Sequence, residues 1–185
     1  DLADNEYWAE NRIITAASIR RMGDIEFVSE LVIGVLHGPQ AGNPSVIDEY
    51  YRQYEDYEDE FPDQRRARKV FDEILRAIQQ ILPTIKEGRW SNKTDFYSLF
   101  VVLAFVQRPL DLSSATAKSV RNALEKFETE IDRRLGDENA KVSKEAVDYV
   151  RAVEKGANDK QRRAVRHAAL VAVLSEHLKF KTVAD

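Results

Sequence analysis

The chain has 185 residues, 43% hydrophobic and 32% charged, with a formal net charge of −4. This balance is typical of a folded domain, and a net acidic chain is poorly suited to coating nucleic acid, because non-specific binding depends on phosphate neutralisation. There is no cysteine, which excludes disulfides, thiolate nucleophiles and cysteine-ligated metal centres. The acidic N-terminus carries no signal segment and no apolar run is long enough to span a bilayer. We therefore expect a cytoplasmic protein without a membrane partner.

Two amphipathic helices are predicted first along the chain. The first covers residues 4–23, with Gly23 as its C-cap. Asp24 is the expected N-cap of a second helix, which ends at His37, because residues 38–44 contain two glycines and two prolines.

The next two predicted helices differ in character. Ser45 begins a helix whose tyrosines form one aromatic stripe as far as Phe61, while the opposite face is acidic. Pro62 is the expected first-turn residue of a fourth helix, which has a strong 3.6-residue period of apolar side chains. The period continues to Ile85 and is interrupted at Pro83.

The segment 93–108 is the most apolar part of the sequence. From Phe96 to Val106 it is apolar on every side, with Ser98 as the clear interruption, so a helix here has no face to give to water. A bilayer would require roughly 20 such residues. We therefore predict a central buried helix that the other helices surround.

Three further helices are predicted after this segment, at 113–135, 143–154 and 159–177, with Ser113 or Ser114, Ser143 and Asp159 as N-caps. No stretch alternates with period 2. The prediction is therefore one all-α domain, residues 1–185, of about eight helices packed around residues 93–108. Because the chain begins with Asp instead of Met, we expect a fragment of a larger multidomain protein.

Basic side chains gather at two predicted helix starts, and one tryptophan lies beside an arginine. The candidates for nucleic-acid contact are Lys160, Arg162, Arg163, Arg166, Arg65, Arg66, Arg68 and Trp90. Cations in a first helical turn are disfavoured by the helix dipole unless an anion is near. That anion could be a carboxylate of this chain, an acidic partner or a phosphate. Trp90 could stack on a base or cover the core, and both interpretations stay open.

Carboxylates offer little evidence of chemistry. Residues 55–60 include five carboxylates, which could hold Mg²⁺ or Ca²⁺, but the spacing of a calcium loop is absent and a solvated helix end explains them. Glu26 and Glu30 share a helix face, and an acid–base pair there, or a metal at 55–60, would make this a free-standing enzyme. The sequence contains no phosphate loop, nucleophile elbow or zinc-helix motif. We predict no catalytic residue, metal or cofactor in this chain.

Four stretches carry a family resemblance: RRMGDIEFVSEL at 20–31, IDEYYRQY at 47–54, TDFYSLF at 94–100 and NDKQRRAVR at 158–166. They resemble the helical region that follows the ParB-like domain in a bacterial family marked by an Asp-Gly-Gln-Gln-Arg motif. That family includes GmrSD-type modification-dependent restriction endonucleases and other phage-defence proteins.

The resemblance implies a parent protein with a nucleotide-handling or nuclease ParB-like domain upstream and, in some members, an HNH nuclease downstream. Neither motif occurs in these residues, so no catalytic role is carried over to any position here. The implied function is a non-catalytic scaffold or interaction domain whose partners are the other domains of the parent, itself a nuclease or NTPase. The alternatives are a DNA- or RNA-contacting module that uses the basic clusters, and a homo-oligomer.

Overall fold

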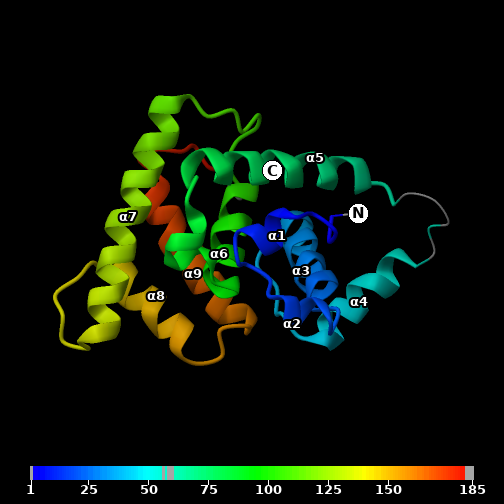
Figure 1. The fold of residues 1–185 in the computed structure, drawn as a ribbon, viewed down its shortest axis with the longest axis horizontal. Helices are drawn as coiled ribbons and strands as arrows, with labels where there is room; N and C mark the ends of the chain where they lie inside the picture. The colour runs from blue at the N-terminus through cyan, green and yellow to red at the C-terminus, as the bar shows by residue number, and fades with distance from the viewer. Residues whose placement is uncertain (1, 56, 58–60, 182–185) are drawn as a thin grey trace.

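The fold is all-α, as predicted, in the computed structural model, which describes residues 2–55, 57 and 61–181 (Figure 1). Within those ranges an isolated bridge between Val106 and Phe180 is the only β pairing. The helices are α1 (Tyr7–Glu10), α2 (Ala16–Ile19), α3 (Gly23–His37), α4 (Pro44–Tyr54), α5 (Gln64–Ile81), α6 (Lys93–Ala104), α7 (Ser114–Gly136), α8 (Lys144–Glu154) and α9 (Lys160–Leu174). Two short 3₁₀ helices, η1 (Ile85–Glu87) and η2 (Arg89–Ser91), precede α6. In this described part of the chain, no helix is both long and apolar enough to cross a membrane.

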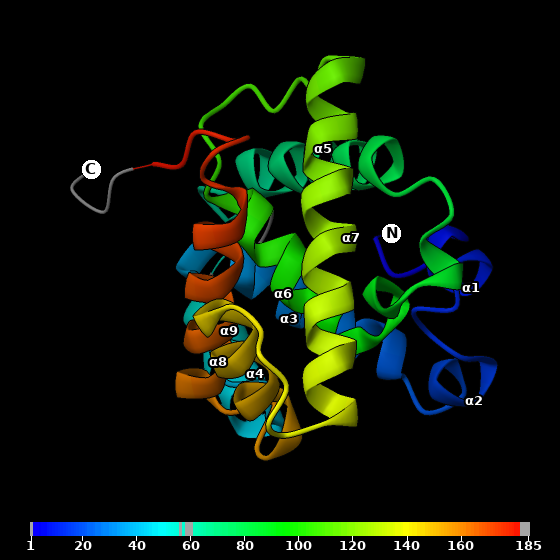
Figure 2. The same cartoon turned by 90° about the vertical axis from the view of Figure 1, so that its left-hand side faces the viewer.

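Helix α6 is the central element, as the sequence predicts. All its residues from Asp95 to Ala104 are buried, and it packs against α3, α5 and α9. In Figures 1 and 2 it lies beneath α5, with α7 and α9 on one side and α3 on the other. The helix ends before the predicted Arg108, because the chain extends at Phe105 and Gln107 to pair with the segment around Phe180.

The predicted continuous helix over residues 4–23 is wrong, since two single-turn helices occupy this region. Arg12 adopts a left-handed conformation with φ 59° and ends α1. In one straight helix, Trp8 and Ile13 would project about 140° apart. The break allows both to be buried, and the Trp8 ring packs edge-to-face on Phe27 and Phe96.

The α2–α3 junction also differs from the prediction. Met22 is in the left-handed region with φ 57°, and Gly23 is the first residue of α3 instead of the C-cap of the preceding helix. A Cβ atom at Gly23 would lie 2.4 Å from the Ser18 hydroxyl. Glycine is required here for the close approach of two chain segments.

Three of the predicted helix starts are confirmed and three are wrong. Helix α3 begins at Gly23, so Asp24 is not its N-cap, and α5 begins at Gln64, so Pro62 lies outside its first turn. Side chains of Ser113, Ser143 and Asp159 each accept a hydrogen bond from a first-turn amide of α7, α8 and α9. Helix α4, however, is capped by Asn43, whose Oδ1 accepts from the Val46 amide at 3.0 Å. The predicted cap at Ser45 is wrong because Pro44 already occupies the first helical turn, where proline is favoured.

Candidate functional site

Arg166 of α9 is fully buried against α6 and does not reach the surface (0% exposed). Its Nε donates to Ser98 Oγ at 2.8 Å, and its two terminal nitrogens donate to the carbonyl oxygens of Ala152 and Ala157 at 2.9 and 2.8 Å. Burial lowers the pKa of Arg166. The guanidinium therefore links α9 to α6, to α8 and to the loop between α8 and α9.

Arg163 makes a second buried link, between α9 and the N-terminal half of the chain. It forms an ion pair with Glu30 of α3, and its guanidinium carbon lies 3.8 Å from the centroid of the Tyr97 ring. It also donates to the Gln40 carbonyl at 3.0 Å. Burial raises the pKa of Tyr97, and the nearby Arg163 partly opposes that rise.

Gly42 permits this contact. A Cβ atom there would lie 2.1 Å from an Nη atom of Arg163 and 2.4 Å from a carboxylate oxygen of Glu30. The Gly42 amide donates to the Asn158 carbonyl at 2.9 Å. The α3–α4 turn is thereby fixed on the start of α9.

A third polar group surrounds the start of α6. Asp95 accepts a hydrogen bond from the Tyr149 hydroxyl at 2.8 Å and pairs with Arg89 at 3.2 Å. Arg89 also pairs with the exposed Asp132 of α7 at 2.7 Å. Burial raises the pKa of Tyr149 well above its ordinary value. We call the set Glu30, Asp95, Ser98, Tyr149, Arg163 and Arg166 the polar core; all are buried except Glu30, whose side chain is 11% exposed.

Three of the predicted nucleic-acid contacts are therefore corrected. Arg163 and Arg166 belong to the polar core, and Trp90, 2% exposed, lies in the hydrophobic core. Their side chains are not available to a phosphate or a base. Because Glu30 is the partner of Arg163, the proposed acid–base pair with Glu26 does not form either.

The other predicted basic contacts are exposed but lie in two separate places. Lys160 and Arg162 are at the start of α9, and Arg65, Arg66 and Arg68 are at the start of α5. In Figures 1 and 2, α5 runs along the upper part of the molecule, whereas α9 begins in its lower part. Nucleic-acid contact by these five residues stays a prediction, without one continuous basic face to support it.

The acidic run at 55–60 falls largely outside the described residues. Glu55, which follows α4, is exposed. Among the residues whose placement is described, no three histidine or carboxylate side chains are grouped so that they could hold a metal ion.

One serine–histidine contact links α7 to the segment after α9. Ser119 Oγ lies 2.8 Å from His177 Nδ1. A serine nucleophile requires a base that a third group orients, and in the described residues no such partner hydrogen-bonds to the other nitrogen of His177. We interpret this contact as a structural tie.

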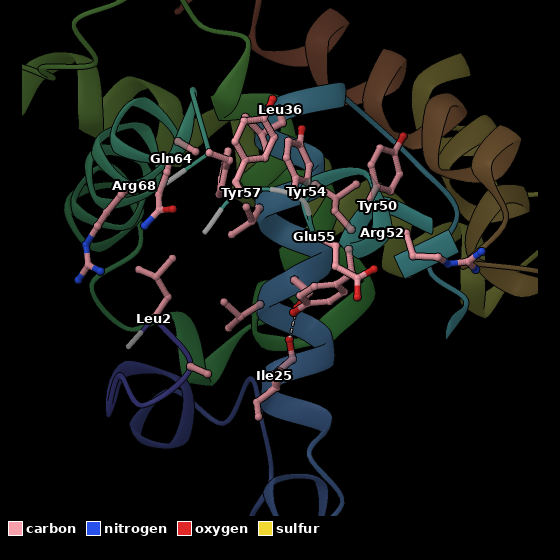
Figure 3. Close-up of a pocket in the computed structure, with 18 of the residues that line it drawn as sticks. Leu2, Ile25, Leu36, Tyr50, Arg52, Tyr54, Glu55, Tyr57, Gln64 and Arg68 are labelled. Carbon is pink, nitrogen blue, oxygen red and sulfur yellow. Dashed lines mark hydrogen bonds between the residues drawn. The ribbon is translucent and has the colours of Figure 1, made fainter. Parts of the chain in front are cut away.

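An open groove of about 950 Å³ lies between α3, α4 and the start of α5 (Figure 3). One face of α3 forms its floor, with Ile25, Val28, Val32 and Leu36 at helical spacing. Phe61 and Ala67 close the side toward α5, and Leu2 lies at the rim.

Tyrosines of α4 form the opposite wall and are held in place by α3. The Tyr51 hydroxyl lies 2.7 Å from Ser29 Oγ, a hydrogen bond drawn in Figure 3. The Tyr54 hydroxyl lies 3.0 Å from His37 Nε2, and the His37 ring stacks on Tyr50 at 4.6 Å between centroids. Burial lowers the pKa of His37, and Asp63 partly opposes this effect.

The wall is only partly covered. In α4, Ile47 is the buried residue, whereas Tyr51 is 56% exposed and Tyr57 is 48% exposed. Ile25 on the floor is 42% exposed. The sequence predicts the aromatic stripe, but a helical period alone does not reveal whether another element covers it. The groove could have been found only from the absence of a further apolar helix to pair with that stripe.

The fold and the site define a class: an all-α domain with an open, aromatic-walled groove and, in the ranges described, no assembled catalytic or metal-binding constellation. Comparison with protein-family models, curated proteins and solved structures found no match to this chain.

Proposed function

We propose that this chain is a non-catalytic helical interaction domain that docks a partner in the α3–α4–α5 groove. The observation that carries this proposal is the exposure of Ile25, Tyr51 and Tyr57 along a groove of about 950 Å³. Folded domains rarely leave a large contiguous apolar surface uncovered unless it binds something. The role is scaffolding: the polar core holds the helices rigidly, and the groove presents a surface.

We further propose that the parent is a cytoplasmic defence-type nuclease of the ParB-like family, in which this domain couples or positions the ParB-like and nuclease domains. Contacts among the four resembling stretches support this. Arg163 and Arg166, from 158–166, contact Glu30 in 20–31 and Tyr97 and Ser98 in 94–100. The Ser29–Tyr51 bond joins 20–31 to 47–54. Because these four stretches contact one another within one fold, we expect proteins of the same family to share all four of them.

The encoding reading frame tests the family assignment. It should continue upstream into a ParB-like domain that contains Asp-Gly-Gln-Gln-Arg. A frame without that motif would overturn the assignment and leave the interaction role to be tested by itself.

Calorimetric titration tests the interaction role. The purified upstream domain should bind the 185-residue chain, and Ile25→Asp should abolish the binding because it places a charge on the groove floor. Leu135→Asp is the matched control, since Leu135 is an exposed apolar residue of α7, outside the groove. Absence of binding, or equal loss in both variants, would overturn the proposal.

Nucleic-acid contact is the alternative function, now supported by five exposed residues instead of eight. Lys160 and Arg162 stand at the amide end of α9, where a phosphate could be accommodated. Because the basic starts of α5 and α9 are separate, we rank this alternative below partner docking.

A further inference from the structure

We infer that the groove binds a single amphipathic α-helix of about three turns, supplied by a partner domain. The side of this helix that lies against α4 carries basic residues. This inference rests on the proposed docking function and adds the shape and charge of the partner. It follows from the length of the floor, the type of backbone around the groove and the charges on its walls.

The floor has the length and pattern that a helix fits. From Ile25 to Leu36, at about 1.5 Å rise per residue, the α3 face extends about 16 Å. Its row Ile25, Val28, Val32 and Leu36 is aliphatic and forms the kind of ridge into which the side chains of a second helix pack. Ile25 is exposed, Val32 and Leu36 are partly exposed, and Val28 lies beneath them, 6% exposed. A helix laid there would cover Ile25 and the partly exposed Val32 and Leu36.

The surrounding backbone favours a helix over an extended peptide. Elements α3, α4 and α5 are helices, so their amide and carbonyl groups are used internally and offer no strand edge for β-augmentation. The volume of about 950 Å³ is also at the upper end of the usual range for a small-molecule pocket, roughly 300–1,000 Å³. A helix inserted between α4 and α5 is therefore the best-fitting occupant.

The charges on α4 indicate which residues the facing side of the partner helix should carry. Asp48 and Glu55 both line the groove and, seven residues apart, lie about two turns from one another on one side of α4. In the part of the chain that the structure describes, neither carboxylate takes part in an ion pair. Arg52 lies between them, but in Figure 3 its guanidinium points away from the floor.

The tyrosine wall is also suited to cations. Faces of exposed tyrosines attract lysine and arginine side chains, and Tyr51 and Tyr57 are both about half exposed. On the α5 side, Arg68 and Gln64 line the groove and favour a neutral or acidic edge. A partner helix with lysines or arginines toward α4 therefore matches both walls and has a defined orientation.

Three fluorescein-labelled synthetic peptides of about 14 residues test the inference by anisotropy with the full chain. All share leucines at helical spacing. The first carries lysines along one edge of the apolar face, the second carries glutamates there, and the third is a scrambled version of the first. The lysine peptide should bind about tenfold more tightly than the scrambled one and about fivefold more tightly than the glutamate one, and the latter preference should shrink at high salt.

Variants locate the effect. Asp48→Asn combined with Glu55→Gln should remove the preference for lysine over glutamate while leaving apolar binding in place. Asp111→Asn combined with Glu138→Gln is the control, because both residues are exposed and outside the groove. An unchanged preference in the first double variant would overturn the charge assignment.

Other outcomes would contradict the inference that the occupant is a helix. Equal binding of the scrambled peptide, tighter binding of a proline-rich peptide, or a dimer of this chain that Ile25→Asp dissociates would each identify a different occupant. If no peptide binds while the upstream domain still binds in an Ile25-dependent manner, this inference fails and the proposed function stands. If the upstream domain also fails to bind, the proposed function fails.

Discussion

The start of α9 and the whole of α4 are both amphipathic in sequence, yet they differ in which side chains the fold buries. In α9, the arginines are turned inward, and Arg163 and Arg166 connect α3, α6 and α8. In α4, Tyr51 is 56% exposed along the groove, and Tyr50 and Tyr54 are only partly buried. Charge therefore holds the centre of this fold together, while apolar surface is left at its edge. Side-chain type alone does not say which part of a domain is structural and which is available for binding.

Adjacent arginines give the largest expected contrast. Arg163→Met should lower the free energy of unfolding by about 3 kcal/mol, because it leaves the largely covered Glu30 carboxylate without its partner. Arg162→Met should change it by no more than about 0.5 kcal/mol, since Arg162 is exposed. Urea unfolding monitored by circular dichroism measures both. Similar losses in the two variants would show that Arg163 is not a structural residue.

The two carboxylates that contact Arg89 give the next contrast. Asp95→Asn should cost about 2 kcal/mol, because the buried Asp95 accepts hydrogen bonds from both Arg89 and Tyr149. Asp132→Asn removes the exposed partner of the same arginine and should cost about 0.5 kcal/mol or less. Unfolding midpoints in urea would contradict the role of the polar core if Asp132→Asn proved the more destabilising change.

His167 should make stability depend on pH. Burial lowers its pKa from 6.5 to about 4, and its ring packs edge-to-face on Phe105 at 5.4 Å. Between these values the unfolded chain binds a proton that the folded chain does not. Stability is therefore complete above pH 6.5 and is lost as the pH falls toward 4, by about 1–2 kcal/mol after allowance for partial exposure.

His167→Leu should remove this part of the pH dependence. Urea unfolding of both proteins at several pH values between 7 and 4, where the difference between them is plotted against pH, isolates the contribution of this residue. If the free energy of unfolding falls equally with pH in both proteins, His167 is not the source of the pH dependence.

A groove residue should matter little for folding. Ile25→Ser should change the free energy of unfolding by about 0.5 kcal/mol or less, because Ile25 is 42% exposed and lies on the open floor. Thermal and urea unfolding both measure it. A loss greater than about 1 kcal/mol would show that Ile25 supports the fold, which would weaken the contrast with the polar core.

The weakest expected signal among these experiments is the binding of nucleic acid. Because its exposed basic clusters are separate, the chain should bind duplex or single-stranded DNA weakly at about 50 mM salt and lose that binding by about 200 mM, with a shallow salt dependence that reflects few phosphate contacts. Fluorescence anisotropy across the salt series measures it, with Arg162→Glu as the variant. A steep dependence, abolished by Arg162→Glu, would favour the nucleic-acid alternative over docking.

Local signals in the sequence predicted much of this fold. The apolar run of α6, interrupted at Ser98, and the caps Ser113, Ser143 and Asp159 each depend on residues within a few positions, and the structure confirms them. The break at Arg12 was not predicted, because a left-handed arginine depends on the burial of Trp8 among distant aromatic rings.

The candidate site was harder to predict, because its components are distant in sequence. Arg163 and Glu30 are 133 positions apart, and neither residue type indicates burial by itself. The tyrosine stripe of α4 was visible, but its half-open state depends on how α5 and α3 meet around it. Sequence patterns therefore identified the α4 face and not the groove.

The α3–α4 turn attaches one end of α4 to the start of α9. The base of α4 is fixed where the Gly42 amide donates to the Asn158 carbonyl and where Gly42 lies against Arg163. At the far end, about 16 Å away, Tyr54 contacts His37 and Phe61. One wall of the groove is therefore tied at its base to α9 and the polar core, although α4 itself makes no direct contribution to that core.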